Sequence, residues 1–203
     1  MKIVETHDIF SVGLFSKSEA WDIACKQVKD AIHATDWPHG SGKFTIYPQS
    51  GKKRGEGNGV VPIKKPCIEN LKKSGWLTEK LPPLDKGVIH PGDLDALFMC
   101  DAGYIGFEWE TGNISSSHRA INKLLLTMQV GGLVGGFLIV PGNNLKTFLT
   151  DRIGNIGELR PYLPLWSSIP IREGVLRIEV VEFDAVSLDV PKIPKGTDGR
   201  ALQ

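Results

Sequence analysis

The chain has 203 residues, of which 41% are hydrophobic and 23% charged. These proportions are typical of one soluble globular domain with a sizeable core, and we expect a single domain over residues 1–203. No apolar stretch approaches the roughly 18 residues of a membrane span. The N-terminus also lacks the basic start and apolar run of a secretory signal, so we expect a cytoplasmic protein without a membrane partner. The net charge of +1 gives no general indication of nucleic-acid binding.

The cysteines Cys25, Cys67 and Cys100 are odd in number and have no C-x-x-C spacing. This pattern favours reduced thiols over disulfides or a zinc site. We expect the three side chains in or near the core.

The first part of the chain contains one clear helix and one short strand. Ser16 with Glu19 forms a capping-box pattern, and apolar residues follow at helical spacing, so we expect a helix from about residue 17 to 34. Residues 43–47 alternate apolar and polar side chains as a half-buried strand does, and Pro48 ends that pattern.

Basic side chains gather between positions 51 and 73. Residues 49–59 combine glycines with the run Lys52 to Arg54 and have nothing to bury, so we expect a mobile loop that a polyanion would order. A helix is expected over residues 63–74. The basic residues are interpreted either as a solvated loop and helix face or as a phosphate-binding segment.

Two strands and a helix are expected in the middle of the chain. Residues 94–98 alternate in a way that predicts a strand with Asp95 on its less buried face, and residues 104–111 predict a second strand. Ser115 or Ser116 can cap the helix that follows, which ends at a pair of glycines.

The last third continues this alternation of strands and helices. The apolar run 134–140 predicts a strand covered on both faces, helices are expected over 145–150 and 157–162, and a further strand is expected around 176–180. Residues 185–203 form an irregular tail. Strands interleaved with helices indicate an α/β domain with a mixed sheet.

An acidic cluster stands out against this framework. Glu108 and Glu110 are two apart on a predicted strand, so their side chains leave the same face. Asp95 on a preceding strand can converge with them on one divalent cation, and oxygen ligands favour Mg²⁺ or Mn²⁺ over zinc. A solvated edge strand and the carboxylate pair of a glycosidase are the alternatives.

The residues after Glu110 favour a nuclease. Residues 111–119 place amide, hydroxyl and guanidinium groups at the start of a helix, beside the expected metal site. Asparagine pairs with adenine edges, arginine with guanine, and helix N-termini with phosphate. Phosphodiester hydrolysis next to a DNA-reading helix is therefore the function that this arrangement predicts.

The block from Glu108 to Lys123 resembles the central motif of the BamHI/OkrAI family of type II restriction endonucleases, and further similar blocks lie at 57–64, 149–162 and 193–199. The resemblance implies a restriction-endonuclease-like, PD-(D/E)xK-type fold with a mixed sheet of about five strands flanked by helices. It also implies a Mg²⁺-dependent homodimer, with Mn²⁺ as a possible substitute, that cuts double-stranded DNA. The implied target is GGATCC, cut after the first G to leave 5′ overhangs, with a protective DNA methyltransferase in the host.

The resemblance also assigns residues to roles. The implied metal ligands are Asp95, Glu108 and Glu79, and Glu110, where most relatives of this fold have lysine, is implied as a base or a water-orienting group. The implied DNA contacts are Asn113, Ser115, Arg119, Asp151 and Arg152 in the major groove, Gly196 and Asp198 in the minor groove, and Lys64 in the matched block. Asp93, an acid that relatives lack at this place, is a competing metal ligand.

Two other functions and several structural interpretations stay open. A DNA-binding protein without nuclease activity would share the scaffold, and a carbohydrate hydrolase would share the carboxylates but explain neither the basic segment nor the reader block. We expect His118 to pack or to contact phosphate. Trp76, Trp109 and Trp166 are expected in the core, because reading duplex edges needs no base stacking.

Overall fold

The computed structural model of the chain describes residues 1–53, 55–84, 91–150 and 152–195. Its centre is a six-stranded mixed sheet with the order β1-β7-β6-β5-β4-β3. β5, β6 and β7 are parallel to one another, and the other neighbouring pairs are antiparallel. The strands are β1 (Lys2–Val12), β3 (Leu77–Lys80), β4 (Leu94–Cys100), β5 (Gly103–Trp109), β6 (Gly135–Pro141) and β7 (Gly174–Glu182).

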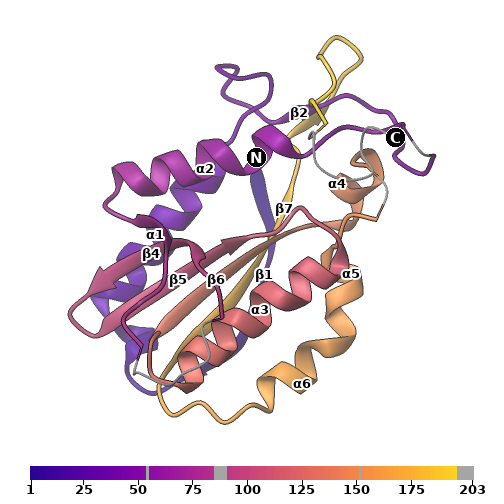
Figure 1. Cartoon of the computed structure of the whole chain (residues 1–203). Coiled ribbons are helices and arrows are strands. Elements are labelled where there is room, and N and C mark those ends of the chain that lie inside the picture. The colour runs from indigo at the N-terminus through magenta and orange to yellow at the C-terminus, as the bar shows by residue number, and fades with distance from the viewer. Residues whose placement is uncertain (54, 85–90, 151, 196–203) are drawn as a thin grey trace.

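Helices cover both faces of the sheet (Figure 1). On one face lie α1 (Glu19–His33) and α2 (Val61–Lys73), whose apolar side chains share a core cluster with the sheet. On the other face lie α3 (Ile114–Gln129), α5 (Ile156–Leu159) and α6 (Leu163–Ser167), which form a second cluster. The remaining helical elements are α4 (Asn143–Phe148), η1 (Phe15–Lys17) and η2 (Arg160–Tyr162). In the part of the chain that is described, no helix has the length and apolar character to cross a bilayer.

Helix α3 packs unusually close to the sheet because the strands beneath it carry glycines. A Cβ atom at Gly106 of β5 would lie 2.9 Å from side-chain carbons of Leu124 and Leu133. A side chain there would therefore push α3 away from β5. The close contact holds the start of α3 at a fixed place relative to the end of β5, where the acidic residues lie.

The predicted fold class is confirmed, with six strands in the central sheet instead of about five. Strands β1 and β3 were not expected, and they form the two edges. The strand predicted over 43–47 is reduced to β2 (Thr45–Ile46), which pairs in parallel with β8 (Ala185–Val186) in a separate small sheet. Its Phe44 and Ile46 are buried as expected.

Two predicted helix caps are corrected. Ser18, not Ser16, caps α1: its side chain accepts a hydrogen bond from the amide of Trp21 at 3.2 Å. Asn113, not Ser115 or Ser116, caps α3 in the same way, with Oδ1 accepting from the amide of Ser116 at 3.1 Å. In both cases the helix begins where the acceptor can reach a free amide of the first turn.

Both ends of the expected loop 49–59 are attached to the rest of the protein, and its mobility stays a prediction. The Gly51 amide donates to Thr147 O at 3.1 Å, and the Asn58 amide donates to Phe148 O at 2.7 Å. The side chain of Asn58 is fully buried and binds Phe148 O again together with two further backbone groups. Composition alone could not indicate this, because the anchoring partners lie about 90 residues away along the chain.

Candidate active site

The acidic residues meet where β4 and β5 lie side by side. The antiparallel register pairs Ala96 with Phe107, so Asp95 lies next to Glu108 in the adjoining strand. Glu110 follows directly after β5, and its amide still bonds to Ile139 O of β6 at 2.9 Å. The charge of Asp95 acts on both glutamates, raising the pKa of each. The structure thus places Asp95, Glu108 and Glu110 near one another, but no three acids among the described residues are arranged to hold one metal ion, so their convergence on one cation stays a prediction.

Glu108 is the most deeply buried of the three acids, with 3% of its surface exposed. Burial first, and then the charge of Asp95, raises the pKa of Glu108 from its ordinary value of 4.5 to about 7. Lys123 of α3 opposes this shift, with its Nζ 2.5 Å from Glu108 Oε1. Oε1 is buried, and apart from this ion pair it accepts no hydrogen bond from the described residues.

Lys123 was not identified from the sequence. It has only 14% of its side chain exposed, and its Nζ also donates to the backbone oxygen of Asp93 at 2.6 Å. The sequence offered one indication of its role, which is its position on α3 next to the buried Leu124. A lysine whose side chain is largely buried is usually paired with an acid. The side chain of Asp93 itself is exposed.

Asp95 is held by two donors. Its Oδ2 accepts from the backbone amide of Trp109 at 2.9 Å, and its Oδ1 accepts from Lys64 Nζ at 2.8 Å. The sequence comparison assigned Lys64 to DNA, whereas the structure places its ammonium group on this carboxylate. Lys64 also lowers the pKa of Glu110, which burial and Asp95 raise. The positive charge of Lys64 therefore belongs to the acidic cluster.

Glu79 is less closely associated with the cluster. The β3–β4 register places it opposite Asp95, but it is exposed and has a left-handed backbone with a φ of 53°. Among the described residues, no three His, Cys, Asp or Glu side chains are arranged to hold a metal ion together. The expected three-carboxylate set with Asp95 and Glu108 is therefore not present, and the ligand role of Glu79 stays a prediction.

Two carboxylates nevertheless suit a hard divalent cation. Asp95 and Glu108 supply only oxygen atoms as ligands, and apart from its ion pair with Lys123, Glu108 Oε1 accepts no hydrogen bond. Negative charge contributes to the raised pKa values of Glu108 and Glu110, and the positive charges of Lys64 and Lys123 do not fully offset it. Mg²⁺ is commonly bound by one or two carboxylates, with water and phosphate completing its shell. The residues present thus fit Mg²⁺ or Mn²⁺.

The residues that we predict to contact DNA bases lie at the start of α3, a few residues after Glu110. Ser115 and Arg119 are exposed on the same side of α3, one helical turn apart, and the charge of Arg119 reaches Glu110. Asn113 is also exposed, but its Oδ1 is engaged in capping the helix. An adenine contact through both amide atoms would have to share that oxygen.

Arg152 lies beside this face. The amide of Gly154 donates to Gly112 O at 2.8 Å, and Ile153 forms a β-bridge with Asn113. Arg152 precedes them, exposed and with a left-handed φ of 67°. The predicted contacts Asp151, Gly196 and Asp198 lie outside the described residues.

Several expected structural residues are where the sequence placed them. Trp76, Trp109 and Trp166 are buried. The ring of His118 packs edge-on against Tyr162, with centroids 4.6 Å apart, and this contact joins α3 to η2. The three cysteines are free thiols, of which Cys67 is fully buried and the other two partly buried.

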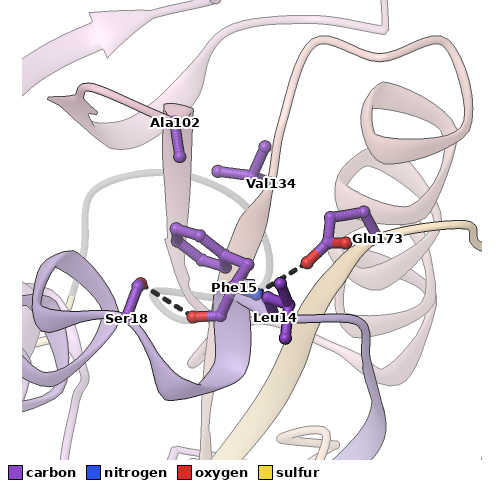
Figure 2. Close-up of a pocket in the computed structure, with 6 residues that line it drawn as sticks. All are labelled: Leu14, Phe15, Ser18, Ala102, Val134 and Glu173. Atoms are coloured by element: carbon purple, nitrogen blue, oxygen red, sulfur yellow. Dashed lines mark hydrogen bonds between the residues drawn. The ribbon is translucent and has the colours of Figure 1, made fainter.

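An open pocket of about 300 Å³ lies at the other end of the strands and takes no part in this site. Figure 2 shows its lining, formed by Leu14, Phe15, Ser18, Ala102, Val134 and Glu173. Ala102 belongs to the turn between β4 and β5, at the opposite end of β4 from Asp95. The Glu173 carboxylate accepts the Phe15 amide at 2.6 Å, which gives it a structural role.

Comparison with known proteins identifies the family. The family model of restriction endonuclease BamHI matches residues 1–200. The chain belongs to the BamHI family of type II restriction endonucleases. It is 44% identical over 177 residues to the type II restriction enzyme OkrAI of Oceanobacter kriegii, covering 87% of this chain and 88% of that protein. It is 36% identical over 192 residues to the type II restriction enzyme BamHI of Bacillus amyloliquefaciens, covering 92% and 86%.

The fold of this BamHI-family enzyme is also that of a more distant restriction endonuclease. The crystal structure of BglII complexed with a DNA 16-mer matches with a TM-score of 0.62 at 12% identity, over 91% of this chain and 79% of that one. This likeness concerns the fold alone. The nuclease class that the carboxylates and the reader block predicted is thus confirmed, and the non-cleaving and glycosidase alternatives are set aside.

The raised pKa of Glu108 makes the stability of this endonuclease depend on pH. Its pKa is about 7 in the folded protein against an ordinary 4.5, so the folded state binds the proton more tightly. The stabilisation from this group is present below about pH 4.5 and is lost as the pH rises through 7. In metal-free buffer, we expect the melting temperature of the native protein to fall relative to that of Glu108→Gln between pH 5 and pH 7. A constant difference would show that Glu108 keeps an ordinary pKa.

Proposed function

We propose that this endonuclease cleaves double-stranded DNA at the palindrome GGATCC, after the first G, leaving 5′ overhangs, and that Mg²⁺ supports the reaction with Mn²⁺ as a substitute. The supporting observation is that Ser115 and Arg119 are exposed on α3 directly beside the cluster of Asp95, Glu108 and Glu110. Reading and cutting groups so close together suit an enzyme that hydrolyses a bond within the sequence it recognises.

Asp95 and Glu108 would hold the cation. When bound there, Mg²⁺ would polarise the scissile phosphate and lower the pKa of a water molecule. Glu110 has a pKa raised by burial and by Asp95, which suits a group that accepts a proton from water or orients it. Lys64 and Lys123 keep the three acids close together by offsetting part of their charge.

We further propose a homodimer, because a palindrome presents two identical half-sites that a two-fold symmetric protein matches. A ring contact between His118 and Trp166 joins the start of α3 to α6. Exposed apolar side chains lie on or next to these two helices: Leu126, Val130, Tyr162 and Leu165. Helix α6 carries no charged residue, which is unusual for an exposed helix. Such a surface suits the contact with a second copy of this chain, because the centres of protein interfaces are depleted of charge.

Digestion of plasmid DNA tests the target. Purified protein with Mg²⁺ should cut a plasmid at each GGATCC, and sequencing of the ends should place the break after the first G. Each changed base pair should reduce binding by about 1 to 3 kcal/mol, so plasmids that lack the site should stay uncut. Ends at another palindrome would reject GGATCC but keep the nuclease, whereas no metal-dependent cleavage of any plasmid would reject the proposed activity.

A further inference from the structure

Asn58 joins three segments that are distant in the sequence. Its Nδ2 donates to Tyr47 O at 2.8 Å and to Phe148 O at 2.9 Å, and its Oδ1 accepts from the Ile193 amide at 3.1 Å. Its backbone oxygen accepts from the Thr150 amide at 2.8 Å. The side chain is fully buried, and its hydrogen bonds all join backbone groups inside the protein.

The same contacts fix one end of the segment that carries Arg152. Asn58 forms a β-bridge with Leu149. A Cβ atom at Gly51 would overlap the Leu149 carbonyl oxygen, so the backbone at Gly51 also packs directly against Leu149. The other end is fixed by the bridge between Ile153 and Asn113. Asn58 thus holds Leu149 and Thr150, and the start of α3 holds Ile153.

Arg152 lies between these contacts, and its left-handed backbone conformation is unfavourable unless neighbouring contacts stabilise it. A non-glycine residue at a φ of 67° is unfavourable by about 1 to 3 kcal/mol and persists where neighbouring contacts determine it. Among the described contacts, the bridge at Ile153 and the hydrogen bonds of Asn58 to Phe148 and Thr150 hold the backbone on either side of Arg152. The side chain of Arg152 is exposed on this short, doubly anchored turn.

We propose that Asn58 is a positioning residue for specificity, which acts by fixing the backbone that presents Arg152 to DNA. This inference rests on the proposed function, together with the DNA contact that the family resemblance implies for Arg152. Asn58 also holds the amide of Ile193, so the same side chain fixes the approach of the C-terminal segment 191–195. It contributes no atom to the DNA contact, since it is fully buried.

The test uses Asn58→Asp, which keeps the shape of the side chain but removes both Nδ2 donors. The carboxylate would face two carbonyl oxygens, of which Tyr47 O would lose this donor and Phe148 O would keep only the backbone amide of residue 58. We expect the ratio of affinities for the cleaved site and for the same duplex with one base pair changed to fall by about 30-fold, comparable to losing one base-pair contact. Amide hydrogen exchange at Thr150 and Ile193 should become faster together.

Asn70→Asp is the matched control, because Asn70 makes the same kind of bond to a backbone oxygen within α2, at 3.0 Å to Pro66 O. It should leave the affinity ratio and these exchange rates unchanged. Should Asn58→Asp fail to fold, Asn58→Ser carries the test, since its hydroxyl can keep one of the bonds without introducing a charge.

A double-mutant cycle separates positioning of Arg152 from general destabilisation. In an Arg152→Ala background, the Asn58 substitution should cause no further loss of discrimination, whereas an equal loss in both backgrounds would overturn the inference. Cleavage by the native protein is measured first. If the native protein does not cleave, the proposed function has failed; if it cleaves and the Asn58 variants discriminate normally, only this inference has failed.

Discussion

Glu108→Ala should abolish cleavage while leaving DNA binding in place. The carboxylate is buried next to Asp95 and carries the oxygen that lacks a hydrogen bond, so it is the central expected ligand of the cation. Loss of a metal ligand removes several kcal/mol of transition-state stabilisation, and about 4 kcal/mol corresponds to a 1,000-fold slower reaction. Single-turnover cleavage of a duplex that contains the site measures the rate, and a gel-shift assay without metal measures binding.

Glu179→Gln provides the control for removing a buried strand carboxylate, to be compared with Glu108→Gln. Glu179 on β7 is also buried and also has a pKa raised mainly by burial, but its partner is the Thr6 hydroxyl, 2.6 Å away. We expect this variant to cut at nearly the native rate. Rapid metal-dependent cleavage by Glu108→Gln would show that the cation is held elsewhere.

Leu165→Glu should convert the proposed dimer into monomers. Leu165 on α6 is 62% exposed and follows the exposed Tyr162 by three residues. A glutamate there would place two negative charges near each other across a two-fold interface and remove both from water. This would destabilise the dimer by several kcal/mol. Sedimentation of the native protein should show a dimer and that of the variant a monomer, and cleavage of both strands at one site should be lost.

Ile23→Glu introduces the same charge at a control position. Ile23 is 41% exposed on α1, which covers the opposite face of the sheet from α6 (Figure 1). This variant should remain a dimer and cut normally. A native protein that sediments as a monomer at the concentrations at which it cuts would refute the dimer itself.

The sequence predicted the elements that contain regular patterns. The continuous apolar run around β6 and the alternation in β5 are local signals, and the structure confirms both strands. Strand β1 escaped notice because its less exposed positions include the polar Glu5 and His7. Burial alternates regularly there, but the sequence shows no apolar period of two. Strand β3 is short and contains the left-handed Glu79, so it shows no period.

The acidic cluster was predictable for a related reason, whereas its counter-charges were not. Asp95 and Glu108 lie on consecutive strands joined by a tight turn, so their proximity follows from local pairing. Lys64 and Lys123 come from helices on opposite faces of the sheet, and their side chains meet the acids only once both layers have packed. The anchoring of residues 49–59 by Asn58 depends in the same way on contacts across the whole chain.

Helix α3 carries Ser115 and Arg119 near its start and the exposed Leu126 on the same side further along. Its 16 residues span about 24 Å as one rigid rod. In the proposed dimer, with Leu126 at the interface, this rod would connect the interface to the reading face, so its length would affect the separation between the two scissile bonds. Inserting a single residue near its middle would swing one end about 100° away from the other, so the spacing of cuts and the mode of pairing have to change together.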